Sequence, residues 1–393
     1  MAIQIQLRGG TASQWSATNP VLASREMGVE TDTLKVKVGD GTQTWSALPY
    51  MQQLGAQYGL FDKADPASVA FTKTAAGTAQ VKAGTRVDVA GTLVSFATAT
   101  SITMPTLTAG TDYYVYCTTA GALSAVAASG AWPTPVASPP ANSRLIGGFH
   151  YAPGGNATGV AGGDTTPAIN AYSLWDLKWR PAAVDPRGMA LVANMVWADI
   201  YLCNRDPQTY GTSRNAQPIA DGETASTTTA IVPTAFGGNG STRYATWNWW
   251  NAAEALAAFG KRHPTYSEFA ALAYGVTEAA SRGNDPVTTG LGTTNAGSSN
   301  ADAKFTSKWG IIQATGTLYA WGANFGGGAA AASWTANTEG RGSTYQMENA
   351  AIFGGVWGES ANSGSRLSLW SSSPTSSYFN FGARGVCDHL TLV

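Results

Sequence analysis

Apolar and polar residues alternate over short stretches in the first part of the chain. The alternation occurs at Ile3–Leu7, Met27–Glu30 and Leu34–Val38. Side chains two apart on a strand face the same side of a sheet, so each stretch predicts a half-buried strand. Arg8–Thr11 carries a turn signal between the first two. Residues 1–54 are therefore expected to form a small module of short strands, which buries too little surface to be stable alone and favours completion by other copies of the chain.

Six more short apolar stretches follow between residues 55 and 172. They are Val69–Phe71, Arg86–Val89, Leu93–Phe96, Ser101–Met104, Tyr113–Tyr116 and Leu145–His150. Turns rich in Gly, Thr and Asp separate them at short spacing. This arrangement predicts a β-sandwich.

The apolar spacing becomes helical after residue 245. Trp249, Ala252, Ala253, Leu256 and Phe259 predict a helix over 246–259, with Gly260 at its end. A second helix is expected over 265–274, because Thr265 and Glu268 form a capping box, and Pro264 separates the two. Elsewhere in 173–393 we expect a long surface loop up to Lys308 and buried strands within 189–203, 309–313 and 318–321. The C-terminal part is thus predicted to be α+β in a mainly β chain.

The segment Gly354–Leu390 mixes Ser, Gly and Asn with aromatic residues and carries few charges. Val356, Gly358, Ser360 and Asn362 are spaced by two, so on a strand they share one face. Antibody paratopes use the same mixture of rigid aromatic rings and small polar side chains. We therefore predict that this segment is a recognition surface on a rigid support.

Composition narrows the class of protein. Only 12% of the 393 residues are charged and the net charge is -1, which gives no indication of nucleic acid or an anionic membrane surface as partner. Cys117, Cys203 and Cys387 are far apart and odd in number, so we expect three free thiols. The alternating start does not resemble a signal peptide, and no apolar run reaches about 18 residues.

Motifs for catalysis or metal binding are weak. Cys387 and His389 share a strand face, but catalytic Cys–His pairs are normally assembled from distant segments, so we interpret the motif as structural. His150 and His263 have no spaced ligand partners. The aromatic cluster at 247–250 is interpreted as core, and Arg366 and Arg384 as buried framework cations. No catalytic residue, cofactor or metal site is predicted.

Several long segments carry a specific resemblance. LRGGTASQW near the start resembles the N-terminal module found at the head of many phage tail-fibre proteins, a small, trimer-forming β-prism. The later segments include YSLWDLKWRPAAVDPRGMALVA, GKRHPTYSEFAALAYGVTEA, FTSKWGIIQATG and the ending FGARGVCDHL. The chain resembles the major tropism determinant family of phage tail-fibre receptor-binding proteins over nearly its whole length. The resemblance implies a homotrimer with a β-prism at 1–54, a β-sandwich at 55–172 and a C-type-lectin-like domain at 173–393.

The resemblance also implies a function at the virion. In the family, a diversity-generating retroelement varies residues near the C-terminus, here about 350–393, and these residues bind a bacterial outer-membrane protein, a pertactin-like autotransporter. Carried over by position, the variable receptor-binding residues are Val356, Gly358, Ser360, Asn362, Leu369, Ser371, Ser372, Ser376, Tyr378 and Asn380. The expected location is the tail-fibre tip, with other tail-fibre proteins as partners and neither nucleic acid binding nor membrane insertion.

Two alternatives stay open at this point. The ending also resembles the formylglycine-generating oxidases, which share the lectin-like fold and bind copper through a cysteine pair. Only Cys203 and Cys387 lie in the C-terminal domain, and nothing in the sequence places them together. A purely structural fibre subunit is the other alternative.

Overall fold

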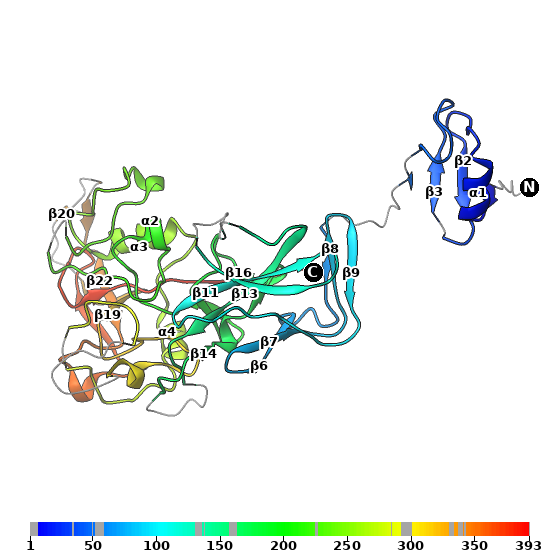
Figure 1. Cartoon of the computed structure of the whole chain (residues 1–393). Coiled ribbons are helices and arrows are strands. Elements are labelled where there is room, and N and C mark those ends of the chain that lie inside the picture. The colour runs from blue at the N-terminus through cyan, green and yellow to red at the C-terminus, as the bar shows by residue number, and fades with distance from the viewer. Residues whose placement is uncertain are drawn as a thin grey trace, which may run out of the picture. The chain divides into compact units, whose positions relative to one another are not determined.

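The structure is a computed structural model with two compact units. It describes residues 7–33, 35–48, 50–51, 59–129, 136, 138–156, 163–224, 227–283, 285–291, 301–329, 334–336, 341 and 343–392. The first unit is Met1–Leu60 and the second begins at Phe61 (Figure 1). Most of the predicted strand Ile3–Leu7 lies outside the described residues.

The first unit is a four-stranded sheet with one helix. Its strands β1 (Arg8–Gly10), β2 (Met27–Glu30), β3 (Val36–Val38) and β4 (Tyr50–Met51) lie in the order β1-β2-β3-β4, and helix α1 spans Ala12–Thr18. The rings of Trp15 and Trp45 stack at 4.0 Å in its small core. The expected turn at Arg8–Thr11 is wrong, because residues 8–10 pair in parallel with β2. The helix was missed, although Thr11 and Gln14 form a capping box that signals its start.

Three sheets form the next part of the chain. Their strands are β5 (Phe61–Asp62), β6 (Phe71–Ala75), β7 (Thr78–Val81), β8 (Thr85–Val89), β9 (Thr92–Phe96), β10 (Thr100–Ser101), β11 (Thr111–Thr118), β12 (Leu123–Ala127), β13 (Ser143–Ala152), β14 (Ala168–Ile169) and β15 (Trp175–Asp176). The strand orders are β10-β7-β6, β5-β8-β9 and β12-β11-β13-β14, with β15 also paired to β13. One apolar cluster joins all three sheets. The alternating stretches thus correctly predicted strands here, each within a few residues.

The C-terminal part combines sheets with short helices. The strands are β16 (Trp179–Pro181), β17 (Met189–Val192), β18 (Val196–Asp199), β19 (Tyr319–Ala329), β20 (Trp334–Ala336), β21 (Ser343–Tyr345), β22 (Glu348–Phe353), β23 (Ser368–Ser372), β24 (Phe381–Gly382) and β25 (Val386–Thr391). The helices are α2 (Pro207–Tyr210), α3 (Trp249–Ala257) and α4 (Tyr266–Leu272), with 3-10 turns η1 (Ala171–Ser173), η2 (Thr234–Phe236), η3 (Ala301–Phe305) and η4 (Ser360–Asn362). The sheets are ordered β16-β25-β18-β17, β23-β22-β19-β24 and β20-β21. The prediction of a mainly β chain is confirmed.

Both predicted helices are present, and three other expectations for the C-terminal part need correction. The capping box of Thr265 and Glu268 starts α4 as predicted. The apolar run 189–203 is a hairpin rather than one strand, because Ala193 and Asn194 turn the chain with positive φ. Residues 309–313 form no strand; they are buried turns whose carbonyl groups serve Arg384. The expected surface loop before Lys308 is partly buried, since Arg282 pairs with the buried Asp302 at 2.7 Å.

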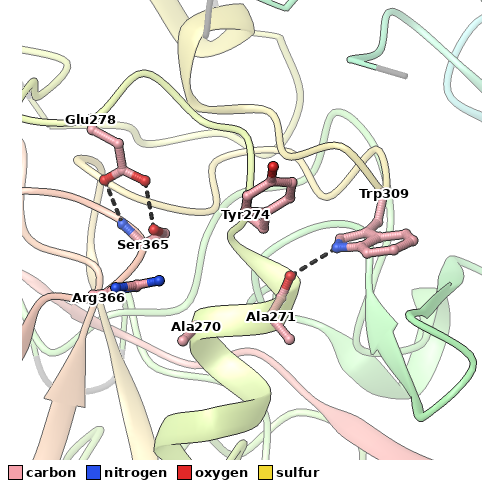
Figure 2. A pocket seen from close by; sticks show the side chains of 7 residues that line it. All are labelled: Ala270, Ala271, Tyr274, Glu278, Trp309, Ser365 and Arg366. Atoms are coloured by element: carbon pink, nitrogen blue, oxygen red, sulfur yellow. Dashed lines mark hydrogen bonds between the residues drawn. The ribbon is translucent and has the colours of Figure 1, made fainter. Parts of the chain in front are cut away.

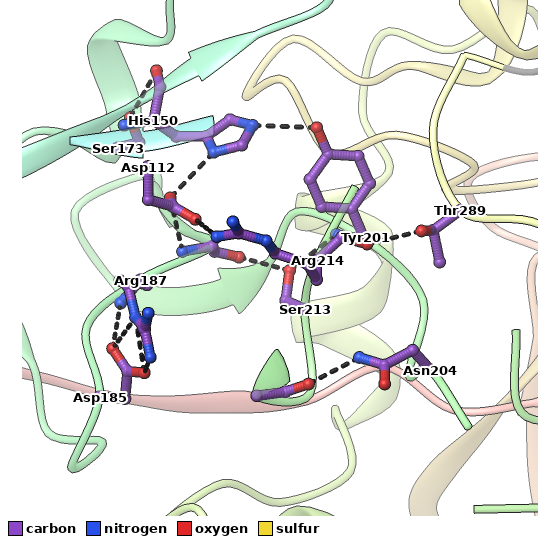
Figure 3. Close-up of polar contacts among 12 residues, drawn as sticks. Asp112, His150, Ser173, Asp185, Arg187, Tyr201, Asn204, Ser213, Arg214 and Thr289 are labelled. Atoms are coloured by element: carbon purple, nitrogen blue, oxygen red, sulfur yellow. Dashed lines mark hydrogen bonds and ion pairs between the residues drawn. The ribbon is translucent and has the colours of Figure 1, made fainter. Parts of the chain in front are cut away.

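A buried polar network ties the strands β11 and β13 to the C-terminal part (Figure 3). His150 lies between Asp112 and the hydroxyl of Tyr201, at 2.9 Å from each. Arg214 contacts the same carboxylate at 3.3 Å, and the amide of Gly188 donates to it at 3.1 Å. Burial acts to raise the pKa of Asp112, but the neighbouring His150 and Arg214 outweigh it and hold the pKa below its usual value. The network is structural and fixes these parts within one unit.

Candidate recognition surface

The segment 354–382 follows β22 and forms two loops around β23. Val356 makes a parallel bridge with Thr317, and the chain then turns through η4 into β23. The predicted strand over 356–362 is therefore wrong. Ser360 has a positive φ of 49°, which breaks any alternation of faces. A second loop, 373–380, leads to β24.

Most of the ten predicted residues still lie at the surface. Gly358, Ser360, Asn362, Leu369, Ser371 and Tyr378 are exposed, and Ser372, Ser376 and Asn380 are half-buried. We call the six exposed residues the candidate surface. Tyr378 is its largest side chain, 54% exposed, and Leu369 is 39% exposed. The six exposed residues thus come from three separate stretches: the loop around η4, strand β23 and the loop before β24.

Val356 does not fit the prediction that its side chain faces outward. It is 9% exposed and packs into the apolar cluster that contains Trp247, Trp321 and Phe381. Asn380 is also more enclosed than expected, since its Oδ1 atom is buried with no hydrogen-bond partner among the described residues. The backbone carbonyl of Asn380 accepts from Tyr319 at 3.0 Å, so the residue anchors the loop to β19.

Glycines and buried polar side chains hold the first loop. Gly354 and Gly355 both have φ of 88°, a conformation that other residues rarely adopt. A Cβ on Gly355 would lie 2.3 Å from the Oγ of Ser363, so no side chain fits there. Glu278 accepts from the amide and hydroxyl of Ser365, at 2.9 and 2.5 Å. The main chain of this first loop is thus held by the close packing of Gly355 against Ser363 and by the hydrogen bonds to Glu278.

Distant segments hold the second loop through its backbone and through the hydroxyl of Ser377. The amide of Trp247 donates to Ser377 Oγ at 2.8 Å, and the amide of Trp249 donates to the Pro374 carbonyl at 3.1 Å. Gly222 donates to the Tyr378 carbonyl at 3.1 Å and packs so closely that a Cβ would lie 2.6 Å from the Tyr378 amide. These contacts hold the backbone of Tyr378 while its side chain stays 54% exposed.

Comparison with known proteins identifies the family. Residues 5–43 match the model of the major tropism determinant N-terminal domain, and residues 69–176 match that of the Mtd second domain. A tail fiber receptor-binding protein of Bordetella phage BPP-1 is 48% identical over 392 residues, covering all of both chains. The chain belongs to the major tropism determinant family.

Solved structures of the family agree over the whole fold. The U1 variant of the major tropism determinant superposes with a TM-score of 0.83, and the P3c variant with 0.82. Both are 48% identical, and each comparison covers 99% of this chain and 100% of the other. The resemblance seen in the sequence is therefore confirmed. Among the described residues, none of the helices has the length and apolar character needed to cross a membrane.

In this member of the major tropism determinant family, one exposed aromatic residue was missed. Phe379 is 49% exposed and its ring lies 5.5 Å from that of Trp357. Its neighbour Tyr378 meets the buried Phe381 edge-on at 5.3 Å. Each exposed ring is thus supported by a more buried one. No sequence pattern marked Phe379 as exposed, because apolar residues in this segment alternate irregularly between core and surface.

The structure places the three cysteines of this family member in the protein interior. All three are free and buried, as the prediction of unpaired thiols requires. Burial raises the pKa of Cys387 to about 11, and His389 instead accepts a hydrogen bond from Trp197 at 2.8 Å. Cys203 and Cys387 belong to different apolar clusters. In the described part of the chain, no group of three or more His, Cys, Asp or Glu side chains is placed to hold a metal ion.

The two arginines interpreted as buried framework residues differ. Arg384 is fully buried and donates to the carbonyls of Asp199, Ile312 and Gln313. Arg366 is exposed, so that half of the interpretation is wrong. Its side chain borders a groove along α4, whose lining is drawn in Figure 2.

Proposed function

We propose that the protein is a phage tail-fibre receptor-binding protein that determines host tropism through the candidate surface. The observation that carries this proposal is the combination of side chains free to change with a backbone that is fixed. Function on a rigid support requires such an arrangement. The family membership and the printed function of the Bordetella phage relative support the same conclusion.

In this proposal the six residues of the candidate surface, together with the half-buried Ser372, Ser376 and Asn380, act as the variable receptor contacts. Tyr378 and Leu369 are the anchors, because large side chains dominate interface energies, and the serines and asparagines supply adaptable hydrogen bonds. Val356 is assigned a packing role, since its side chain is buried. Selection then acts on exposed side chains without disturbing the core.

The proposed assembly is a homotrimer at the tail-fibre tip. Its domains are a β-prism at 1–54, a β-sandwich at 55–172 and a C-type-lectin-like domain at 173–393. Among the described residues of the first unit, the core consists of four buried apolar side chains, and so small a core supports an assembly in which several copies stabilise one another. Several weak sites on one particle raise avidity by about 10²–10⁴-fold, which lets single contacts stay weak.

The proposed receptor is a protein of the bacterial outer membrane, and the proposed role is binding rather than catalysis. The separation of Cys203 and Cys387 into different clusters argues against a copper-dependent oxidase. No cofactor enters the proposal. Partners other than the receptor are further tail-fibre proteins.

Tyr378→Ala tests this function. We expect binding of the purified chain to cells of the susceptible strain to fall about tenfold or more, because an anchor is removed. Thermal stability should stay unchanged, since the side chain is exposed. Tyr210→Ala, which removes a ring of 41% exposure from α2, is the matched control and should bind normally. Unchanged binding in Tyr378→Ala, Leu369→Ala and their double variant would contradict the proposal.

A further inference from the structure

A groove outside the candidate surface runs beside residues 365–366. It has a volume of about 690 Å³ and is lined by Ala270, Ala271, Tyr274, Glu278, Trp309, Ser365 and Arg366. In Figure 2 the polar residues Glu278, Ser365 and Arg366 stand on one side, Trp309 on the other, and α4 between them. The groove is open because the helix presents only methyl groups there. Its size lies within the roughly 300–1,000 Å³ of small-ligand sites.

Aromatic rings form two walls of the groove. Tyr274 is 54% exposed, and its hydroxyl has no hydrogen-bond partner among the described residues. Trp309 is held in place, because its Nε1 donates to the Ala271 carbonyl at 2.8 Å and Tyr172 meets it edge-on at 4.9 Å. The Lys308 ammonium lies 5.2 Å from the centre of the Trp309 ring. Trp309 is therefore a wall that loses little freedom when a ligand binds.

The polar side of the groove is balanced in charge. Glu278 is fixed by its two hydrogen bonds from Ser365 and keeps further lone pairs for a ligand. Arg366 has no ion-pair partner in the part of the chain that the structure describes, and its guanidinium carries several free donors. Within the lining, the charges of Glu278 and Arg366 cancel, and the Lys308 ammonium is already placed against the Trp309 ring. A cationic ligand would meet Arg366 and Lys308, an anionic ligand would meet Glu278, and an apolar peptide would leave both lining groups unpaired.

We propose that this groove is a calcium-independent binding site for one uncharged saccharide unit, a hexopyranose. A sugar ring has an apolar face that packs on an aromatic wall and hydroxyls that both donate and accept. Those features match Tyr274 and Trp309 on one hand and Arg366 and Glu278 on the other. Binding itself does not depend on the proposed function. The role that we propose for the site, weak binding of bacterial surface glycans in addition to receptor binding by the candidate surface, rests on the proposed function.

The test is saturation-transfer NMR with the full chain in EDTA, with methyl glucuronide as the charged comparison and three neutral probes: methyl α-glucopyranoside, methyl α-mannopyranoside and methyl α-galactopyranoside. At least one should show transfer with a Kd on the order of 1 mM, the weak range expected for a single unit. Ala270→Leu fills the groove and should reduce the transfer at least fivefold, with thermal stability unchanged. Tyr274→Ala should also reduce it, and Tyr210→Ala should not.

Four results would overturn the proposal. They are no transfer to any of the three glycosides, equal transfer in Ala270→Leu, binding of methyl glucuronide in place of the neutral sugars, or a smaller oligomer in Ala270→Leu, which would make the groove a contact between copies. Binding of the chain to cells of the susceptible strain tests the proposed function separately. A chain that fails the sugar test but still needs Tyr378 for cell binding refutes this inference alone.

Discussion

Burial separates residues that look equivalent along the chain. Arg366 and Arg384 both lie in the C-terminal segment next to glycine or serine, yet Arg384 is fully buried and Arg366 is exposed. The difference arises from carbonyl groups about 70 and 185 residues away, at Ile312, Gln313 and Asp199. Burial lowers the pKa of Arg384 to about 10, and the three carbonyls satisfy its donors. No local pattern reports such distant partners.

Replacing each arginine with methionine tests this contrast. Arg384→Met should lower the free energy of unfolding by about 3 kcal/mol or more, because three buried carbonyls lose their donors. Arg366→Met should change it by no more than about 0.5 kcal/mol. Urea denaturation of both variants measures the difference. Equal losses would contradict the roles assigned to the two side chains.

Sequence signals that act within one helical turn predicted the elements correctly. Elements that depend on residues far away in the chain were not predicted. The capping box at Thr265 marks the start of α4, and Gly260, which has a positive φ, follows three residues after the last residue of α3, because such signals act within one turn. The strand predicted over 356–362 was wrong, since its spacing of two arises in a loop. That loop depends on Glu278 and Thr317, which only the fold brings near.

Two glycines in this loop provide a matched test of the rigid support. Gly355→Ala should destabilise the protein by about 2 kcal/mol or more, because the residue has a positive φ and its Cβ meets Ser363. Gly358→Ala should be neutral within about 0.5 kcal/mol, since no atom lies within 4 Å of the added Cβ. Thermal unfolding of both variants checks this. A neutral Gly355→Ala would show that the loop is not rigidly held.

The loop before η3 contributes a pH dependence. Burial, together with the negative charges of Asp221 and Glu223, raises the pKa of Asp285 to about 6. An unfolded Asp has a pKa of about 4, so between these values the folded protein binds more protons. This residue therefore makes stability fall as pH rises from about 4 to 6, with no further change above.

Asp285→Asn should remove that contribution. The stability of the variant relative to the unmodified chain should be greater at pH 7 than near pH 4, by about 1–2 kcal/mol after allowance for partial exposure. Denaturation curves at the two pH values measure it. A relative stability that does not change with pH would show that the carboxyl group titrates normally.

For the whole molecule, long segments of unusual composition were more informative than the periodicity of apolar residues. Long unusual segments such as YSLWDLKWRPAAVDPRGMALVA identified the family, and the comparisons confirm it. Alternation predicted most middle strands, but helix α1 and the hairpin at Ala193–Asn194 were missed. Six of the ten predicted residues are exposed, whereas Val356 is core. Periodicity failed where a loop, rather than a strand, carries the site.

The proposed assembly predicts a mass in solution. Light scattering of the full chain should give three times the 40.6 kDa of one copy. The physical reason is the small core of the first unit, which needs neighbouring copies. A monomer at micromolar concentration would contradict the trimer, and each particle in solution would then carry only one candidate surface.

The central claim is that the support stays fixed while the candidate surface changes. The most direct measurement replaces Gly358, Ser360, Asn362, Leu369, Ser371 and Tyr378 together with other residue types, and records both thermal unfolding and binding to the susceptible strain. We expect the melting temperature to shift by only about 2–4 °C, which corresponds to a change of about 1 kcal/mol in the free energy of unfolding. Binding should be lost or redirected to another strain. A complete loss of cooperative unfolding, or unchanged binding to the original strain, would contradict the account.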